Sequence, residues 1–127
     1  MAARFPAGRW LPPFALMAVI FLLSAQPNLS SGLGLIDLVG RKLVHAAEFG
    51  LLCVLWWRAL RTVARPRPAL VAAALVSVLY AASDEYHQSF VAGRSGNPLD
   101  VLIDTLGIAV AWVLLERRHV RRHTTVP

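Results

Sequence analysis

The amino-acid sequence predicts an all-α protein, an integral membrane bundle of four transmembrane helices. The chain of 127 residues is 57% hydrophobic and only 16% charged, whereas soluble domains use roughly 45–50% apolar and about 25% charged residues. The apolar residues form four separate blocks, and tryptophan and arginine lie near the block ends, as they do at membrane interfaces. We therefore expect a single membrane domain over residues 1–127.

The first block covers residues 10–26 and is predicted to be a retained membrane helix. Pro12 and Pro13 fit its first turn, where a missing N–H costs little. A signal peptide is the alternative, because the block follows a basic start and Ala25 could precede a cleavage site. Leu23 would then occupy a position that normally carries a small residue, and the apolar run is long for a signal peptide.

The other three blocks cover residues 43–60, 69–88 and 99–115. Each approaches the ~20 residues that span a bilayer core, and flanking arginine side chains can extend the span by snorkelling. A soluble helical bundle would need polar faces with helical period, and the third block has none. The lone Cys53 cannot form an internal disulfide, so we interpret it as a small hydrophobic residue.

Basic residues predict the orientation of the bundle. Arginines are most frequent in the N-terminal tail, between the second and third blocks, and in the C-terminal tail. Because cytoplasmic segments carry the excess of Lys and Arg, we expect both termini in the cytoplasm. The net charge of +6 does not predict a nucleic-acid partner, since no soluble module remains to dock on a duplex. Membrane lipids are the expected partners.

With this orientation, the ionisable residues within and beside the spans collect toward the outer side. At about 100° per residue, Lys42, His45 and Glu48 follow one face of a helix. The end of the third block, the next loop and the start of the fourth block add Asp84, Glu85, His87, Gln88, Arg94, Asp100 and Asp104. A charge inside a membrane costs about 2.5–3.5 kcal/mol on insertion scales. We therefore expect a polar pocket between the helices, open to the extracytoplasmic face.

Two stretches, "RKLVHAAEFG" and "SDEYHQSFVAGRSGNPLDVLIDTLG", resemble the VanZ-like family of small bacterial membrane proteins. The resemblance covers residues from about 41 to 115, and more loosely the first predicted helix. It places the family motif on Lys42, His45, Asp84, Glu85, His87, Gln88, Phe90, Arg94, Asp100, Asp104 and Gly107. Ala92 replaces a frequent proline, and Asp104 replaces a frequent asparagine and adds a negative charge.

The resemblance implies a protein of the bacterial inner membrane that is tied to the cell envelope. The family takes its name from a protein associated with low-level resistance to the glycopeptide teicoplanin. The resemblance supplies no reaction and no cofactor, so binding and catalysis both remain open.

The first functional hypothesis is binding. Lys42 and Arg94 would hold the anionic group of an envelope lipid, a lipid-linked precursor or a glycopeptide, because arginine binds oxyanions with two parallel hydrogen bonds. Such binding would contribute to glycopeptide tolerance.

The second hypothesis is a metal-dependent hydrolase of lipid-linked substrates. His45 and Glu48, and likewise Asp84 and His87, have the i, i+3 spacing found in di-metal carboxylate bundles. Two histidines and several carboxylates would suit Zn or Mn.

A third hypothesis is a proton-coupled transporter, because His45 titrates near neutral pH and Glu48 and Asp104 could relay protons. Four short helices leave little room for a pathway unless the protein is a homo-oligomer. The same residues could also form only a structural network of ion pairs. Gly50 and Gly107 predict close helix packing and no chemistry.

Overall fold

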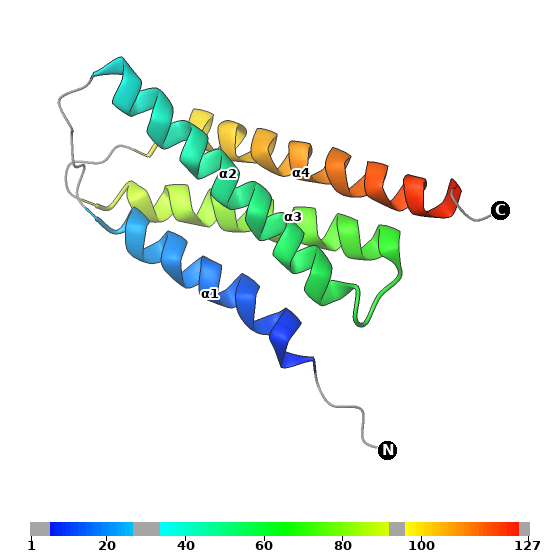
Figure 1. Cartoon of the computed structure of the whole chain (residues 1–127). Helices are drawn as coiled ribbons and strands as arrows, with labels where there is room; N and C mark the ends of the chain where they lie inside the picture. Colours follow the sequence, from blue (N-terminus) through cyan, green and yellow to red (C-terminus); the bar gives the residue numbers. More distant parts are fainter. Residues whose placement is uncertain (1–5, 27–33, 92–95, 125–127) are drawn as a thin grey trace.

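The structure is a computed structural model that describes residues 6–26, 34–91 and 96–124, and over these residues the chain forms four helices (Figure 1). They are α1 (Ala7–Ser24), α2 (Leu35–Leu60), α3 (Pro66–Gln88) and α4 (Pro98–Thr124). All four helices are long and apolar enough to cross a membrane. The predicted class, an all-α integral membrane bundle of four transmembrane helices, is confirmed.

Successive helices run in opposite directions, so their ends gather at the two ends of the bundle (Figure 1). These two ends carry different kinds of side chain. The start of α1, the α2–α3 connection and the end of α4 lie at one end, which we call the basic end. Its arginines include Arg9, Arg58, Arg61, Arg65, Arg67, Arg117, Arg118, Arg121 and Arg122. The opposite end brings together the end of α1, the start of α2, the end of α3 and the start of α4.

Two helices extend well beyond the predicted spans. α2 begins at Leu35 and not at residue 43, because Asp37 and Arg41 form an ion pair of 2.9 Å one helical turn apart. This pair lets the helix continue through a charged stretch that the hydropathy pattern excluded. α4 continues past residue 115 to Thr124. Basic side chains in its last turn stabilise the helix by interacting with the negative end of its dipole.

The prediction for the two prolines was wrong. α1 begins at Ala7, so Pro12 and Pro13 lie inside the helix and not in its first turn. The residues before them remain helical because the Trp10 indole packs on neighbouring chain segments. Its ring contacts the Trp56 ring edge-on at 6.3 Å between centroids, and its N–H donates to the hydroxyl of Thr62 at 3.0 Å. Tertiary contacts therefore outweigh the loss of two backbone donors.

The bundle interior combines small side chains with several large apolar ones, and many other large apolar side chains face outward. Ile20, Phe49 and Leu52 are fully buried, and the surrounding core includes Cys53, Ala73, Ala81, Ile108 and Ala111. Side chains such as Leu22 and Leu79 are more than half exposed. Exposed apolar side chains of this kind suit a bundle whose outer surface meets lipid. The small residues of the interior let the helices approach closely.

Candidate functional site

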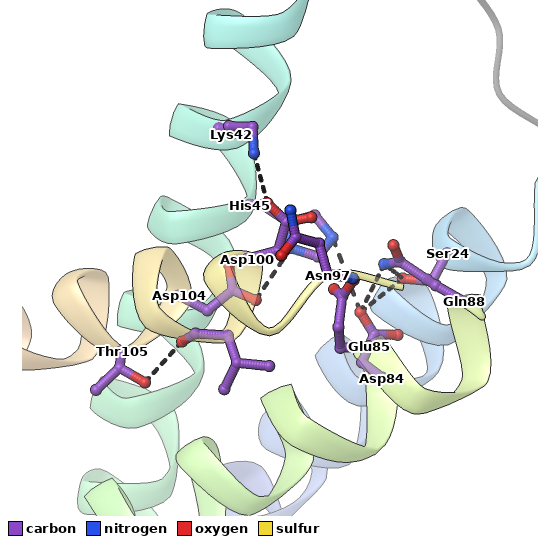
Figure 2. Close-up of polar contacts among 11 residues, drawn as sticks. Ser24, Lys42, His45, Asp84, Glu85, Gln88, Asn97, Asp100, Asp104 and Thr105 are labelled. Atoms are coloured by element: carbon purple, nitrogen blue, oxygen red, sulfur yellow. Dashed lines mark hydrogen bonds and ion pairs between the residues drawn. The ribbon is translucent and has the colours of Figure 1, made fainter. Parts of the chain in front are cut away.

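Polar side chains from all four helices meet at the end of the bundle opposite the basic end. Figure 2 shows these side chains directed toward one another between the helices. We call them the polar cluster, which consists of Ser24, Lys42, His45, Asp84, Glu85, Gln88, Asn97, Asp100 and Asp104. The alternating direction of the helices explains the meeting, since α1 and α3 end where α2 and α4 begin.

His45 on α2 links the carboxylates of the two neighbouring helices. Its Nδ1 lies 3.1 and 3.3 Å from the two carboxylate oxygens of Asp104 on α4. Its Nε2 lies 3.8 Å from Oδ2 of Asp84 on α3. The side chains of both aspartates are only 2% exposed, and that of His45 is 26% exposed. A neutral imidazole has one donor nitrogen, so only the protonated ring can donate toward both carboxylates.

Asp84 is the point at which α1 joins the polar cluster. Its Oδ2 accepts hydrogen bonds from the Ser24 hydroxyl at 2.8 Å and from the Gln88 amide at 3.1 Å. The same amide lies 3.2 Å from the Ser24 hydroxyl, so the three side chains form a closed triangle. The other oxygen, Oδ1, is buried and has no hydrogen-bond partner among the described residues. This oxygen can therefore accept a hydrogen bond from a further donor. Such a bond would be favourable, because an unsatisfied buried group costs about 1–3 kcal/mol.

Lys42 and Asp100 form the rim of the polar cluster. The Lys42 ammonium lies 2.5 Å from Oδ1 of Asp100, and the two side chains are 32% and 28% exposed. This ion pair is therefore in contact with the surroundings, whereas the aspartates beneath it are not. An exposed pair of this kind contributes little stability, typically about 0–1 kcal/mol. Lys42 can accordingly exchange its partner at small cost.

Glu85 ties the segment before α4 to the end of α3. Its carboxylate accepts a hydrogen bond of 2.6 Å from the backbone N–H of Asn97. The Asn97 side chain in turn accepts from the backbone N–H of Leu99 at 3.0 Å, at the start of α4. These bonds hold the first turn of α4 near α3, and Asp100 and Asp104 follow within that helix.

A close crossing of α2 and α4 sets the position of His45 relative to Asp104. A Cβ added to Gly50 would lie 2.9 Å from the carbonyl oxygen of Gly107, and a Cβ added to Gly107 would overlap the backbone of Ala46. The helices can approach this closely only without side chains at the two glycines. The crossing lies within about one turn of both His45 and Asp104, so it keeps their side chains within hydrogen-bond distance.

Two of the predicted site residues, His87 and Glu48, make none of these hydrogen bonds or ion pairs. Arg94 lies outside the described residues. The His87 ring stacks on Phe21 of α1 with 4.6 Å between centroids, and its buried Nδ1 has no hydrogen-bond partner among the described residues. Glu48 is half-buried and makes no ion pair with a described lysine or arginine. It is nevertheless close enough to interact electrostatically with His45, Asp84 and Asp104.

Sequence reasoning missed two members of the polar cluster, Ser24 and Asn97. Ser24 was visible in principle, because it is the last residue of α1 and the only hydroxyl-bearing residue of that helix. Asn97 contributes its backbone N–H to Glu85, and a backbone contact leaves no signal in side-chain chemistry.

The four residues considered as metal ligands do not converge in the structure. Within residues 6–26, 34–91 and 96–124, no group of three or more His, Cys, Asp or Glu side chains is arranged to hold a metal ion. His87 faces Phe21, while both ring nitrogens of His45 already face carboxylates. The metal-dependent hydrolase thus stays a prediction that the described residues do not support.

Comparison with known proteins gives one finding. The model of the VanZ/LLP1 family matches residues 8–119, which include every residue of the polar cluster and all of the four helices except the first residue of α1 and the end of α4. No curated protein and no solved structure matches the chain significantly.

Proposed function

The chain belongs to the VanZ/LLP1 family, and from this membership and the polar cluster we propose that it is a binding protein of the cell envelope. Its polar cluster takes the phosphate or another anionic group of an envelope lipid or of an envelope-directed molecule. In this proposal the protein lies in the bacterial inner membrane with both termini in the cytoplasm, so that the polar cluster faces outward.

The placement of Lys42 carries the proposal. It is a cation at the accessible rim of the polar cluster, above buried carboxylates, and Asp100 alone among the described acidic residues holds it. A phosphate that replaces Asp100 gains a charge-assisted hydrogen bond, while the exposed Lys42–Asp100 pair costs little to open. Arg94 belongs to the same family motif, and we propose that it serves as a second cation for the ligand.

Thermal unfolding of the purified protein in a neutral detergent tests this proposal, with short-chain phosphatidylglycerol as the probe. The lipid should raise the unfolding midpoint, because a ligand that binds only the folded state stabilises it. Lys42→Met should remove most of that rise. The matched control is Arg67→Met, which removes an exposed cation from the basic end and should leave the rise intact.

The control separates two binding places for an anionic lipid. If Arg67→Met removed the rise and Lys42→Met did not, the lipid would be held at the basic end and the proposal would fail. A cellular test follows from the same site. Expression of the protein in a glycopeptide-susceptible strain should increase teicoplanin tolerance, and Lys42→Met at equal membrane abundance should not.

One observation favours a second function, a proton-coupled transporter. The His45 imidazole lies between the carboxylates of Asp104 and Asp84, and such chains of ionisable groups within membranes carry protons. In this case proteoliposomes containing the protein should dissipate an imposed pH gradient, and His45→Phe should abolish the flux. Absence of any flux above that of empty liposomes would remove this candidate.

A further inference from the structure

We infer that the ligand of the polar cluster carries an amino group as well as a phosphate, as an aminophospholipid headgroup does. This inference rests on the proposed function and names the ligand class. The phosphate would meet Lys42 at the rim, and the ammonium would meet the carboxylates beneath it.

The charges of the polar cluster and its neighbour Glu48 do not balance. Five carboxylates are present, those of Glu48, Asp84, Glu85, Asp100 and Asp104. Among the described residues of the polar cluster, the cations that stand against them are Lys42 and, if it is protonated, His45. A purely anionic ligand would increase this negative excess. Because uncompensated charge near hydrocarbon costs about 2.5–3.5 kcal/mol per group on insertion scales, the arrangement favours a ligand that brings a positive charge.

A buried carboxylate oxygen without a hydrogen-bond donor, Oδ1 of Asp84, indicates where the positive charge of the ligand would bind. Asp84 is 4% exposed, and its Oδ1 is buried without a hydrogen-bond partner among the described residues. Glu48, one turn after His45 on α2, is half-buried and unpaired with the described lysines and arginines. A primary ammonium has three N–H donors and no acceptor, so it can satisfy carboxylates of this kind directly.

The described residues favour an ammonium over a metal ion. A divalent cation at such a site needs several converging ligands, and no group of three suitable side chains occurs in the described part of the chain. An ammonium needs only oriented acceptors. The polar cluster lies toward one end of four membrane-length helices, and we expect lipid headgroups, which carry amino and phosphate groups together, near that end.

Three short-chain lipids with identical acyl chains test the inference on the full-length protein in a neutral detergent. Phosphatidylethanolamine supplies phosphate and N–H donors, phosphatidylcholine supplies phosphate and a cation without N–H, and phosphatidylglycerol supplies phosphate and a neutral glycerol group. Phosphatidylethanolamine should raise the unfolding midpoint more than either of the others. Soluble O-phosphoethanolamine, added separately, distinguishes a lipid ligand from a free phosphoamine, since the lipid should act at lower concentration.

Two variants locate the amino group. Asp84→Asn and Glu48→Gln should each weaken the apparent affinity for phosphatidylethanolamine by about tenfold, as expected for one lost charge-assisted hydrogen bond. Neither should weaken the response to phosphatidylglycerol, because that headgroup has no ammonium for these carboxylates to bind. The matched control is Glu116→Gln, which removes a carboxylate at the opposite end of α4 and should change neither response. The comparison of the three lipids on the unaltered chain remains decisive if Asp84→Asn does not fold.

The outcomes separate the inference from the proposed function. An equal response to phosphatidylglycerol and phosphatidylethanolamine, lost in Lys42→Met, would overturn the inference that the ligand carries an amino group. It would leave the proposed function standing. No response to any of the lipids would overturn both. Stabilisation by magnesium chloride that is lost in Asp84→Asn would show that the carboxylates bind a metal ion, and it would overturn the inference of an amino group.

Discussion

At the scale of single residues, the polar cluster contains two kinds of ion pair that the sequence does not distinguish. The His45–Asp104 contact is mostly buried, since the Asp104 side chain is only 2% exposed. The Lys42–Asp100 contact is shorter, but both side chains remain about one-third exposed. Screening by the surroundings weakens an exposed pair, so distance alone does not rank these two contacts.

A pair of double-mutant cycles measures this difference. We expect a coupling energy on the order of 1–3 kcal/mol between His45→Ala and Asp104→Ala, since buried partners in one network couple strongly. The coupling between Lys42→Ala and Asp100→Ala should stay below about 1 kcal/mol. The free energy of unfolding in mixed detergent micelles provides the measurement. Equal coupling in both pairs would contradict this ranking.

The residues of the site were predictable to different degrees. Periodicity and alternating helix direction place Lys42 and His45 opposite Asp100 and Asp104, as the structure does. Ser24 gave a weaker signal than these four residues, because one hydroxyl in an apolar block has no periodic partner and is an ordinary helix residue in most contexts. Its role depends on where α1 packs against α3, which hydropathy does not determine.

At the scale of helices, the contact between α2 and α4 controls the geometry of the site. Gly50 and Gly107 face each other where the backbones are closest, and the pairs formed by His45 and Lys42 lie on the same two helices. Any side chain added at the crossing must push the helices apart. The separation would weaken both ion pairs together.

Substitution of two glycines tests the role of the crossing. Gly107→Ala should destabilise the protein by about 1–3 kcal/mol, because the added methyl group overlaps the backbone of Ala46 and overpacking costs this much. Gly40→Ala on α2 is the matched control, since nothing lies within 4 Å of its added Cβ. That change should stabilise the helix by roughly 0.5–1 kcal/mol. Thermal unfolding of both variants in detergent checks the opposite signs.

The helix positions were predictable from hydropathy, but their ends were not. An apolar block marks the part of a helix inside the membrane, while the helix itself continues wherever backbone bonds and local ion pairs support it. The Asp37–Arg41 pair extends α2 toward its start in this way. The start of α1 shows the same kind of error, since packing of Trp10 keeps a helical turn ahead of the two prolines.

At the scale of the whole molecule, the two ends of the bundle differ in charge. The basic end carries most of the arginines, and the opposite end carries the acidic polar cluster. Because arginine-rich connections remain in the cytoplasm, this asymmetry predicts that the polar cluster faces away from it. The same asymmetry would orient the protein even without a cleaved signal.

Cysteine labelling in spheroplasts tests this orientation. In a Cys53→Ala background, Phe90→Cys should react with a membrane-impermeant maleimide, because residue 90 is 72% exposed at the end that holds the polar cluster. Val120→Cys, near the basic end of α4 and 56% exposed, should react only after permeabilisation. The unaltered chain is the control, since its Cys53 is fully buried. The reverse labelling pattern would invert the topology.

Unequal helix lengths have a consequence for the surrounding bilayer. At 1.5 Å per residue, the 18 residues of α1 measure about 27 Å, whereas the 26 residues of α2 measure about 39 Å. The short helix falls below the ~30 Å thickness of a typical hydrocarbon core, so lipid beside it must thin or α1 must stand more upright than its neighbours. Ser24 ends that short helix and bonds to Asp84. Thicker membranes would therefore draw the Asp84 carboxylate deeper among the acyl chains, and acyl-chain length becomes a variable that tunes the hydration of this carboxylate.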